Sequence, residues 1–380
     1  MNTGTEGNVV RTPRTPKTFL RVCLAALAAL PFTAIQACAG GDASSGDGKT
    51  ITFGVSAPAP GGNMLQLGIA QTKSYFSAEG ITVKPVFLGT GGAVVQALAS
   101  GKVQIGTSTP DLVLQAVDRG QDVTMFYNWT TKNVTQFGVL PDSPVRSVAD
   151  LKGRTVGVQE LSAGPAQLAK AAAVNAGLDP AGDLKFIAVG TGAPALDALV
   201  RHRVDALVTY DTLFAAMTNG TGQALRFFPP DGVGDLFASS LVASNGWLKD
   251  HPAAAAGFGR AWAKASVYAD TNPGDGIKMM FAAFPSSKVG ADDQAATKAA
   301  LAQFDARRRS LYGGGKPPAT QQWGAYPPAA VQHWIGYAKQ QKLIHSDLAP
   351  DKVYTNEFVA KFNAFDANAI KKAAGSGATP

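Results

Sequence analysis

The chain is poor in cysteine, in charge and in long hydrophobic runs, and each shortage excludes a class of protein. Its 380 residues contain two cysteines, so neither a disulfide-rich fold nor a metal site built on several thiolates is available. Charged residues make up 16% of the chain and hydrophobic residues 46%, which excludes an intrinsically disordered protein. The apolar run at residues 22–35 is shorter than the about 20 residues that a membrane-spanning helix needs.

Familiar catalytic motifs are also missing. The sequence has no P-loop and no H-E-x-x-H zinc motif, and its nearest approach to G-x-S-x-G, residues 106–110, ends in proline. Residues 89–94 (GTGGAV) lack the third glycine of the dinucleotide fingerprint. None of the four histidines lies at metal-ligand spacing. We therefore expect no catalytic residues, no metal and no cofactor.

The first 37 residues have the composition of an export signal. Four basic residues and one acid precede the apolar run, which is the order found in secretory signal peptides. Small residues then stand just before Cys38, which resembles a bacterial lipobox, with Ile35 where leucine is commoner. An ordinary signal peptide beside a chance cysteine is the alternative. We predict a signal peptide over 1–37, a lipid on Cys38 and a flexible Gly/Ser-rich tether over 38–49, and hence an exported protein anchored to the membrane by its lipid.

From residue 51 onward, short strands alternate with helices, which predicts parallel βαβ units. Strands are expected at 51–56, 81–88, 103–106 and 123–127. The pattern recurs about 100 residues later, where Gly190-Thr191-Gly192-Ala193 matches Gly89-Thr90-Gly91-Gly92. Chance similarity between two βαβ units is the alternative to a true repeat. In either case we predict an α/β protein with two similar lobes and a central cleft.

The lobe boundaries follow from where this pattern stops and restarts. Lobe 1 is expected to comprise 50–135 and 243–372, and lobe 2 to comprise 136–242, with a frayed tail over 373–380. Residues 237–244 are interpreted as a strand near the end of lobe 2, and two crossovers between the lobes would form a hinge. Candidate helices in the last third span 251–270, 291–310, 328–341 and 355–367. The basic run Arg307-Arg308-Arg309 is expected on a solvated helix face.

In a two-lobed α/β fold, a ligand lies where the carboxyl ends of the strands face each other. The loops after the predicted strands are rich in Gly, Ser and Thr ahead of helices, where free N–H groups and the helix dipole favour an anion or a polar oxygen. Taken singly, such residues are more often caps and turns, but seven such loops around one crevice indicate a binding site. The candidate ligand-binding residues are Ser56, Asn63, Gly91, Gly92, Ser108, Thr109, Trp129, Glu160, Ser162, Thr191, Gly192, Tyr210 and Asp211.

Some of these side chains bear on the nature of the ligand. Trp129 and Tyr210 either stack on a planar ligand or simply pack the cleft. A carboxylate that faces a bound anion is costly without a cation nearby, and no Arg or Lys stands in these loops. Asp111 and Asp211 are also explained as first-turn helix acids, whereas Glu160 is not. If Glu160 faces the cleft, the ligand carries an N–H or a positive group.

The net charge of +7 at first suggests a nucleic-acid or membrane surface, but its distribution does not. Residues 1–37 account for +3 of it, and the rest of the chain has +4. Its basic residues are scattered, with no stripe interleaved with aromatic residues, so a nucleic-acid partner is excluded.

Several segments resemble one known family. Residues 51–56 (ITFGVS), 77–116, 148–160 (VADLKGRTVGVQE) and 206–211 (ALVTYD) are similar to the periplasmic solute-binding proteins of ABC importers. The similarity is to the nitrate/sulfonate/taurine and thiamine-pyrimidine-precursor group, and it covers about half of the chain, from about residue 49 to 244.

This resemblance implies a type II periplasmic-binding-protein fold that closes over a small organic solute, either sulfonate/taurine-like or aminopyrimidine-like. The solute would pass to an ABC permease and its ATPase, and we expect the binding protein to be a monomer. An exported enzyme on the same fold and a ligand-sensing domain for a membrane receptor are the alternatives. The fungal enzymes of the group need a cysteine-rich motif, which this chain lacks.

Overall fold

The computed structural model describes residues 49–230, 232–233, 236–290, 292–312 and 321–376. The predicted signal peptide, the predicted lipidation site Cys38 and all of the predicted tether except Lys49 lie outside the described residues. No helix in the described part of the chain combines the length and the apolar character that crossing a membrane requires.

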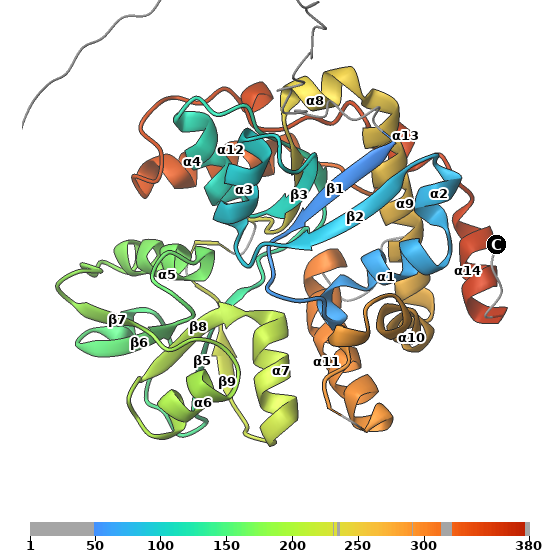
Figure 1. Cartoon of the computed structure of the whole chain (residues 1–380). Coiled ribbons are helices and arrows are strands. Elements are labelled where there is room, and N and C mark those ends of the chain that lie inside the picture. Colours follow the sequence, from blue (N-terminus) through green and yellow to red (C-terminus); the bar gives the residue numbers. More distant parts are fainter. Residues whose placement is uncertain (1–48, 231, 234–235, 291, 313–320, 377–380) are drawn as a thin grey trace, which may run out of the picture. The chain divides into compact units, whose positions relative to one another are not determined.

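Two five-stranded sheets form the framework, one in each lobe (Figure 1). The four strands expected in the first lobe are confirmed as β1–β4, and a fifth strand, β10, lies between β3 and β4. In the first sheet β1 pairs in parallel with β2 and β3, and β10 runs antiparallel to β3 and β4. The order in space is β2 (Thr82–Phe87), β1 (Thr50–Val55), β3 (Ile105–Ser108), β10 (Ser240–Ala243) and β4 (Thr124–Asn128).

The second sheet repeats this topology. Its three parallel strands are again followed by an antiparallel one, because β5 pairs antiparallel with β8 and β9. Equivalent GTG turns end β2 and β7, and Gly89 and Gly190 have φ of 81° and 73°, which favours glycine at both positions. The order in space is β7 (Leu184–Ala188), β6 (Arg154–Val158), β8 (Ala206–Tyr210), β5 (Thr135–Val139) and β9 (Arg226–Phe228).

One expected boundary is wrong. Residues 237–244 were interpreted as closing lobe 2, but the strand found there, β10, lies between β3 and β4 in the first sheet. In each lobe the antiparallel strand is the one that follows a crossover from the other lobe: β5 comes directly after β4, and β10 is the first strand after β9. The hydrophobic pattern predicts such a strand but does not identify the strands with which it pairs.

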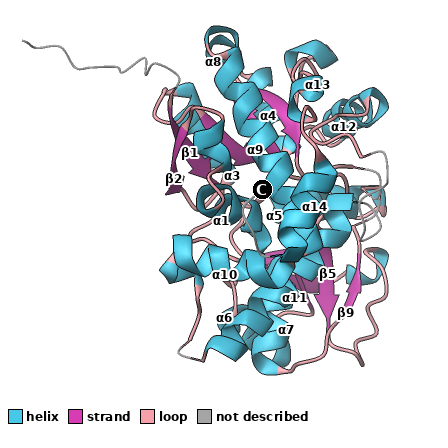
Figure 2. Cartoon of the chain, turned by 90° about the vertical axis from the view of Figure 1, so that its right-hand side faces the viewer, coloured by secondary structure: helices cyan, strands magenta, loops and turns pink. Residues whose placement is uncertain are grey.

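The helices cover both sheets, and α9, α10, α11 and α14 lie along one flank (Figure 2). The helices expected at 251–270, 291–310 and 328–341 are confirmed as α9, α11 and α12, whereas 355–367 contains only the short α13. The helices are α1 (Leu65–Thr72), α2 (Tyr75–Ala78), α3 (Gly91–Ala99), α4 (Pro110–Asp118), α5 (Gly164–Asn175), α6 (Ala193–Val200), α7 (Asp211–Thr221), α8 (Asn245–Asp250), α9 (Pro252–Thr271), α10 (Pro273–Ala283), α11 (Asp293–Tyr312), α12 (Pro328–Gln340), α13 (Val359–Phe362) and α14 (Ala367–Ser376), with short 3-10 turns at Gly62–Met64, Ala149–Leu151, Pro285–Ser287 and Pro350–Lys352.

The expected frayed tail is wrong for its first four residues. Helix α14 continues to Ser376, and Ala374 is fully buried in the first-lobe core. The side-chain amide of Asn272 also donates a hydrogen bond to the carbonyl of Ala374 at 3.0 Å. Alanine is small enough to pack against α9. The sequence analysis missed this contact because the residues that follow Ala374 are small and polar. Residues 377–380 lie outside the described residues.

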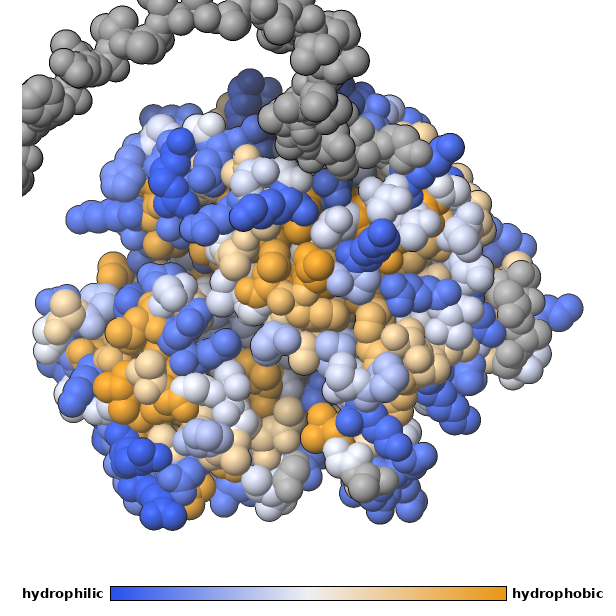
Figure 3. Space-filling model, viewed as in Figure 1, coloured by the Kyte–Doolittle hydropathy of each residue, from blue (hydrophilic) through white to orange (hydrophobic). Residues whose placement is uncertain are grey.

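Aromatic rings fill the core of the first lobe beneath the sheet. Trp262 of α9 is fully buried, and its ring centroid lies 5.6 Å from that of Phe53 and 5.8 Å from that of Phe258. It also contacts Trp129, which follows β4, edge to face at 5.4 Å. This stack links the core to the end of the sheet where the predicted ligand loops lie. On the face in Figure 3, hydrophobic residues reach the surface only in separate patches among polar ones.

Candidate functional site

A cavity of about 490 Å³ lies where the strand-end loops of the two lobes meet. Loops after β1 and β2 and the segment after β4 line it from the first lobe, and loops after β6, β7 and β8 line it from the second. The lining includes most of the residues that the sequence analysis proposed for ligand binding, namely Ser56, Asn63, Gly91, Gly92, Thr109, Trp129, Glu160, Ser162, Thr191 and Tyr210.

On the first-lobe side, hydrogen bonds and close packing fix the loop conformations. The backbone N–H and the hydroxyl of Ser56 both lie 2.9 Å from the hydroxyl of Thr107. Thr90 caps α3 by accepting a hydrogen bond from the N–H of Ala93 at 3.2 Å. A Cβ on Gly91 would lie only 2.9 Å from Leu112 Cδ1 and Ser108 Oγ, so a larger residue fits here only if these side chains shift. Helix α3 thus begins at the cavity wall with Gly91 and Gly92, which have no side chains to cover its first N–H groups.

On the second-lobe side, α5 begins against the first lobe. A Cβ on Gly164 would lie 3.4 Å from the Tyr210 hydroxyl and 3.5 Å from that of Thr109. Thr109 is the residue before α4, and Tyr210 is the residue before α7, so three helix N-termini meet at this point. The residues that precede these helices make no side-chain cap. At α7 the first two N–H groups already have partners, because Asp211 N–H donates to the carbonyl of Val134 at 2.8 Å and Thr212 N–H donates to Asp211 Oδ1 at 2.7 Å.

Three of the predicted site residues are placed elsewhere. Ser108 is buried behind α3, where its hydroxyl donates to the carbonyl of Gly91 at 3.4 Å. Gly192 precedes α6 with φ of 68° and does not reach the cavity lining, unlike its neighbour Thr191. Asp211 points away from the cavity toward α11, because a buried cation there binds its carboxylate.

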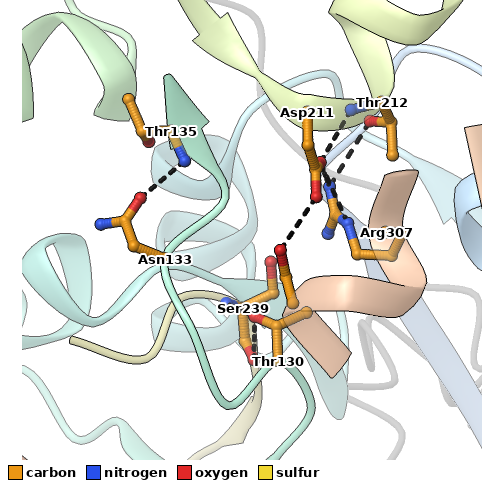
Figure 4. A network of polar contacts seen from close by, with 8 residues as sticks. Thr130, Asn133, Thr135, Asp211, Thr212, Ser239 and Arg307 are labelled. Atoms are coloured by element: carbon orange, nitrogen blue, oxygen red, sulfur yellow. Dashed lines mark hydrogen bonds and ion pairs between the residues drawn. The ribbon is translucent and has the colours of Figure 1, made fainter. Parts of the chain in front are cut away.

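That cation is Arg307, and the sequence analysis did not propose it as a site residue. Arg307 lines the cavity, and its guanidinium donates to Asp211 Oδ1 from Nη2 at 2.9 Å and from Nε at 3.2 Å. The same Nη2 lies 3.4 Å from the Thr212 hydroxyl (Figure 4). Ser310 completes the group by donating to Asp211 Oδ2 at 3.1 Å. Because α11 belongs to the first lobe and α7 to the second, this buried ion pair joins the two lobes.

The expectation that residues 307–309 lie on a solvated face is wrong for Arg307, which is 4% exposed. Helical spacing contains the signal that was missed. Arg307 follows Phe304 by three residues and precedes Leu311 by four, and both of these hydrophobic residues are buried. Arg307 therefore lies on the apolar face of α11, whereas Arg309 is exposed.

The two crossovers between the lobes lie side by side. The backbone N–H groups of Trp129 and Thr130 both donate to the carbonyl of Ser239, at 3.1 and 3.0 Å, and the N–H of Ala238 donates back to the carbonyl of Thr130 at 3.0 Å. The first crossover also contacts α11, because the N–H of Lys132 donates to the carbonyl of Ser310 at 3.1 Å. The segments that connect the lobes are therefore bonded to each other and to the helix that carries Arg307.

Behind the cavity, Asp111 lies in a small, mostly apolar pocket at the contact between the lobes. Its side chain is 1% exposed, and neither carboxyl oxygen makes a hydrogen bond in good geometry to a described residue. The pocket also has Thr109, Asn133 and Tyr210 in its wall. Burial raises the pKa of Asp111, and the nearby Thr109 hydroxyl and the N–H groups of Asp111 and Leu112 offset this only in part. Burial and the charge of Asp111 in turn raise the pKa of Tyr210 above its usual value.

We predict that Asp111→Asn stabilises the protein at neutral pH. The raised pKa means that folding at pH 7.5 requires either a buried charge or the uptake of a proton, and both cost free energy that an amide does not cost. The expected gain is on the order of 1 kcal/mol, and it should shrink as the pH falls toward about 4, where the carboxyl of the unfolded chain also takes up a proton. Urea unfolding of both proteins at pH 4 and pH 7.5 measures it. A stability difference that is equal at the two pH values would contradict this assignment.

The described ranges contain no group of three or more His, Cys, Asp or Glu residues arranged to hold a metal ion. The fold and the cavity instead define a class. Two α/β lobes of the same topology, joined by two paired crossovers around a cavity that both lobes line, make up the periplasmic-binding-protein fold.

The chain belongs to the family described as NMT1/THI5 like, whose model matches residues 62–275. No curated protein sequence matches the chain. Among solved structures, it is similar to the alkanesulfonate-binding protein SsuA from Xanthomonas axonopodis pv. citri bound to MOPS, with a TM-score of 0.61 and 17% identity over 81% of this chain and 99% of that one.

Two further solved structures have the same fold. The periplasmic aliphatic sulphonate binding protein SsuA from Escherichia coli has a TM-score of 0.59 and 17% identity over 80% of this chain and 91% of that one. The periplasmic nitrate-binding protein NrtA from Synechocystis PCC 6803 has a TM-score of 0.59 and 13% identity over 85% of this chain and 91% of that one. At such identities these similarities establish the fold of the chain and leave its solute open.

Proposed function

We propose that this chain is the extracytoplasmic solute-binding component of an ABC importer. It would be exported by its N-terminal signal, anchored through a lipid on Cys38, and would deliver a small organic solute to a permease and its ATPase. The observation that carries the proposal is the cavity of about 490 Å³ lined by strand-end loops of both lobes. Such a volume suits a small molecule, and a site shared between two lobes is the arrangement that couples binding to closure.

Hinge closure is the mechanism that this arrangement favours. A solute that contacts Ser56 and Gly91 on one side and Ser162 and Thr191 on the other stabilises the closed form, because an open form offers only one of these sets. The paired crossovers at Trp129–Thr130 and Ala238–Ser239 are short and hydrogen-bonded to each other. They can bend together while the two sheets move as rigid bodies.

The cavity wall offers the solute three kinds of contact. Hydroxyl and amide groups such as Ser56 and Asn63 supply hydrogen bonds, and the helix N-termini near Gly91 supply N–H donors for an acidic oxygen. Trp129 supplies an aromatic surface. A sulfonate/taurine-like solute would use the N–H donors, and an aminopyrimidine-like solute would use the aromatic surface. Both classes fit this part of the wall.

We predict that Gly92→Trp abolishes solute binding without unfolding the protein. Gly92 lines the cavity, and a Cβ built on it has no atom within 4 Å, so a large side chain occupies the solute's space rather than the protein's. Native mass spectrometry of protein purified without denaturation should detect a retained small molecule in the wild type and none in Gly92→Trp.

Gly336→Trp is the matched control, because it places the same substitution on a helix glycine with open space outside the cavity. Its solute occupancy should equal that of the wild type. Retention of the same molecule by Gly92→Trp at wild-type occupancy would refute this site.

A further inference from the structure

The charges on the cavity wall restrict the solute further than the fold does. Among the described lining residues only Glu160 and Arg307 are charged. They are not equivalent, because Arg307 already has a counterion and Glu160 has none. Which of the two charges remains available to a solute decides the solute's own charge.

Arg307 contributes little net positive charge to the cavity. Asp211 accepts two hydrogen bonds from its guanidinium, and both side chains are almost fully buried, with 5% and 6% of their side-chain surface exposed. A buried pair at this distance acts on its surroundings as a dipole rather than as a free cation. An anionic solute would therefore have to compete with Asp211 for the same guanidinium.

Glu160 remains as the uncompensated charge. It lies in the loop between β6 and α5, it is half-buried, and its carboxylate has no hydrogen bond or ion pair to a residue that the structure describes. Its charge is near enough to Tyr210 to contribute to the raised pKa of that phenol, after burial and the charges of Asp111 and Asp211. A carboxylate in a cleft that closes over a solute needs a positive partner or N–H donors from that solute.

The aromatic residues of the wall suit the same partner. Trp129 and Tyr210 both line the cavity, and the ring faces of tryptophan and tyrosine attract cations. Leu112, Leu213 and Met64 complete an apolar surround, in which the interaction between opposite charges is stronger than in water. An anion in the same place would lie beside the uncompensated Glu160.

We propose that the cavity selects a solute with a positively charged nitrogen, an organic ammonium or amidinium ion, and that Glu160 is the residue that determines this specificity. The inference rests on the proposed function, since it concerns the solute of the same site. It differs from the anions named for the sulfonate- and nitrate-binding proteins of the same fold.

Two isosteric series of compounds test the inference by thermal unfolding of the purified chain. One series is benzamidinium, benzamide and benzoate, and the other is butylammonium, 1-butanol and butane-1-sulfonate, all at equal concentration. We expect the two cations to raise the Tm of the wild type and the neutral and anionic members to leave it unchanged, because a ligand that binds only the folded state raises Tm.

Glu160→Gln should remove the response to the cations, with an affinity at least about tenfold weaker, because the amide keeps the shape and loses the charge. Glu357→Gln is the matched control, since Glu357 is exposed and lies outside the cavity. Asp211→Asn should have the opposite effect on the anions, whose binding should strengthen once the Arg307 charge is released. If Asp211→Asn fails to fold, Glu160→Gln alone decides the inference.

The possible outcomes separate the two proposals. A Tm response to benzoate or butane-1-sulfonate without one to the cations overturns the inference and leaves the solute-binding function standing. A cation response that survives in Glu160→Gln also overturns it. If none of the six compounds changes Tm, the inference fails, and the retained solute in the comparison of Gly92→Trp with the wild type still decides the proposed function independently.

Discussion

Replacing Arg307 by methionine is expected to lower the free energy of unfolding by about 3–5 kcal/mol, the cost of leaving one member of a buried ion pair without its partner. Methionine is similar in length but cannot donate to Asp211, which would keep only the hydrogen bonds from Ser310 and from the N–H of Thr212. The contact between α11 and α7 joins the lobes, so cavity binding should weaken with stability.

Urea unfolding of three proteins checks this expectation. Arg309→Met is the matched control, because Arg309 lies on the same helix and is exposed, and its unfolding free energy should stay within about 0.5 kcal/mol of the wild type. The double variant Arg307→Met/Asp211→Asn should recover part of the loss, because it removes the unpaired charge as well. A stability of Arg307→Met equal to that of Arg309→Met would show that the pair is not buried as described.

Truncation of Trp262 to alanine is the second large effect we expect, with a loss of about 3–5 kcal/mol in unfolding free energy. The indole is fully buried and contacts Phe53, Phe258 and Trp129, so its removal leaves a cavity that these rings cannot fill without leaving their own positions. Because Trp129 lines the solute cavity, its ring would also lose the support that fixes its orientation. Weaker solute binding should therefore accompany the loss of stability.

Chemical denaturation and native mass spectrometry of the same preparations measure the two effects together. Trp262→Phe, which keeps an aromatic ring in the space, should cost clearly less than alanine. Trp247→Ala serves as the comparison, since Trp247 of α8 is only partly buried, and it should cost less than Trp262→Ala and leave binding unchanged. Equal losses for the Trp247 and Trp262 variants would contradict the central place of Trp262 in the core.

Much of the candidate site could be predicted because it depends on local rules. A residue that follows a strand and precedes a helix lies at the carboxyl end of a parallel sheet, so Ser56, Gly91, Thr109 and Thr191 could be placed near the cleft from spacing alone. Glu160 was singled out by the same rule, and it does line the cavity. This rule does not predict the direction in which a side chain points. Ser108 and Asp211 turn away from the cavity because the carbonyl of Gly91 and the guanidinium of Arg307 bind them.

The sequence by itself determined the α/β class, the alternation of strands and helices in the βαβ units and the GTG turns, because these follow from hydrophobic period and backbone conformational freedom over a few residues. Only the tertiary structure decided that β10 returns to the first sheet and that Arg307 reaches the cavity from a helix about 100 residues after Asp211. Strand pairing and buried ion pairs join segments far apart in the chain, so their free energy appears only when both partners are in place. The charge of the cavity wall, which has a compensated arginine and an uncompensated glutamate, is therefore a property of the fold and not of any one segment.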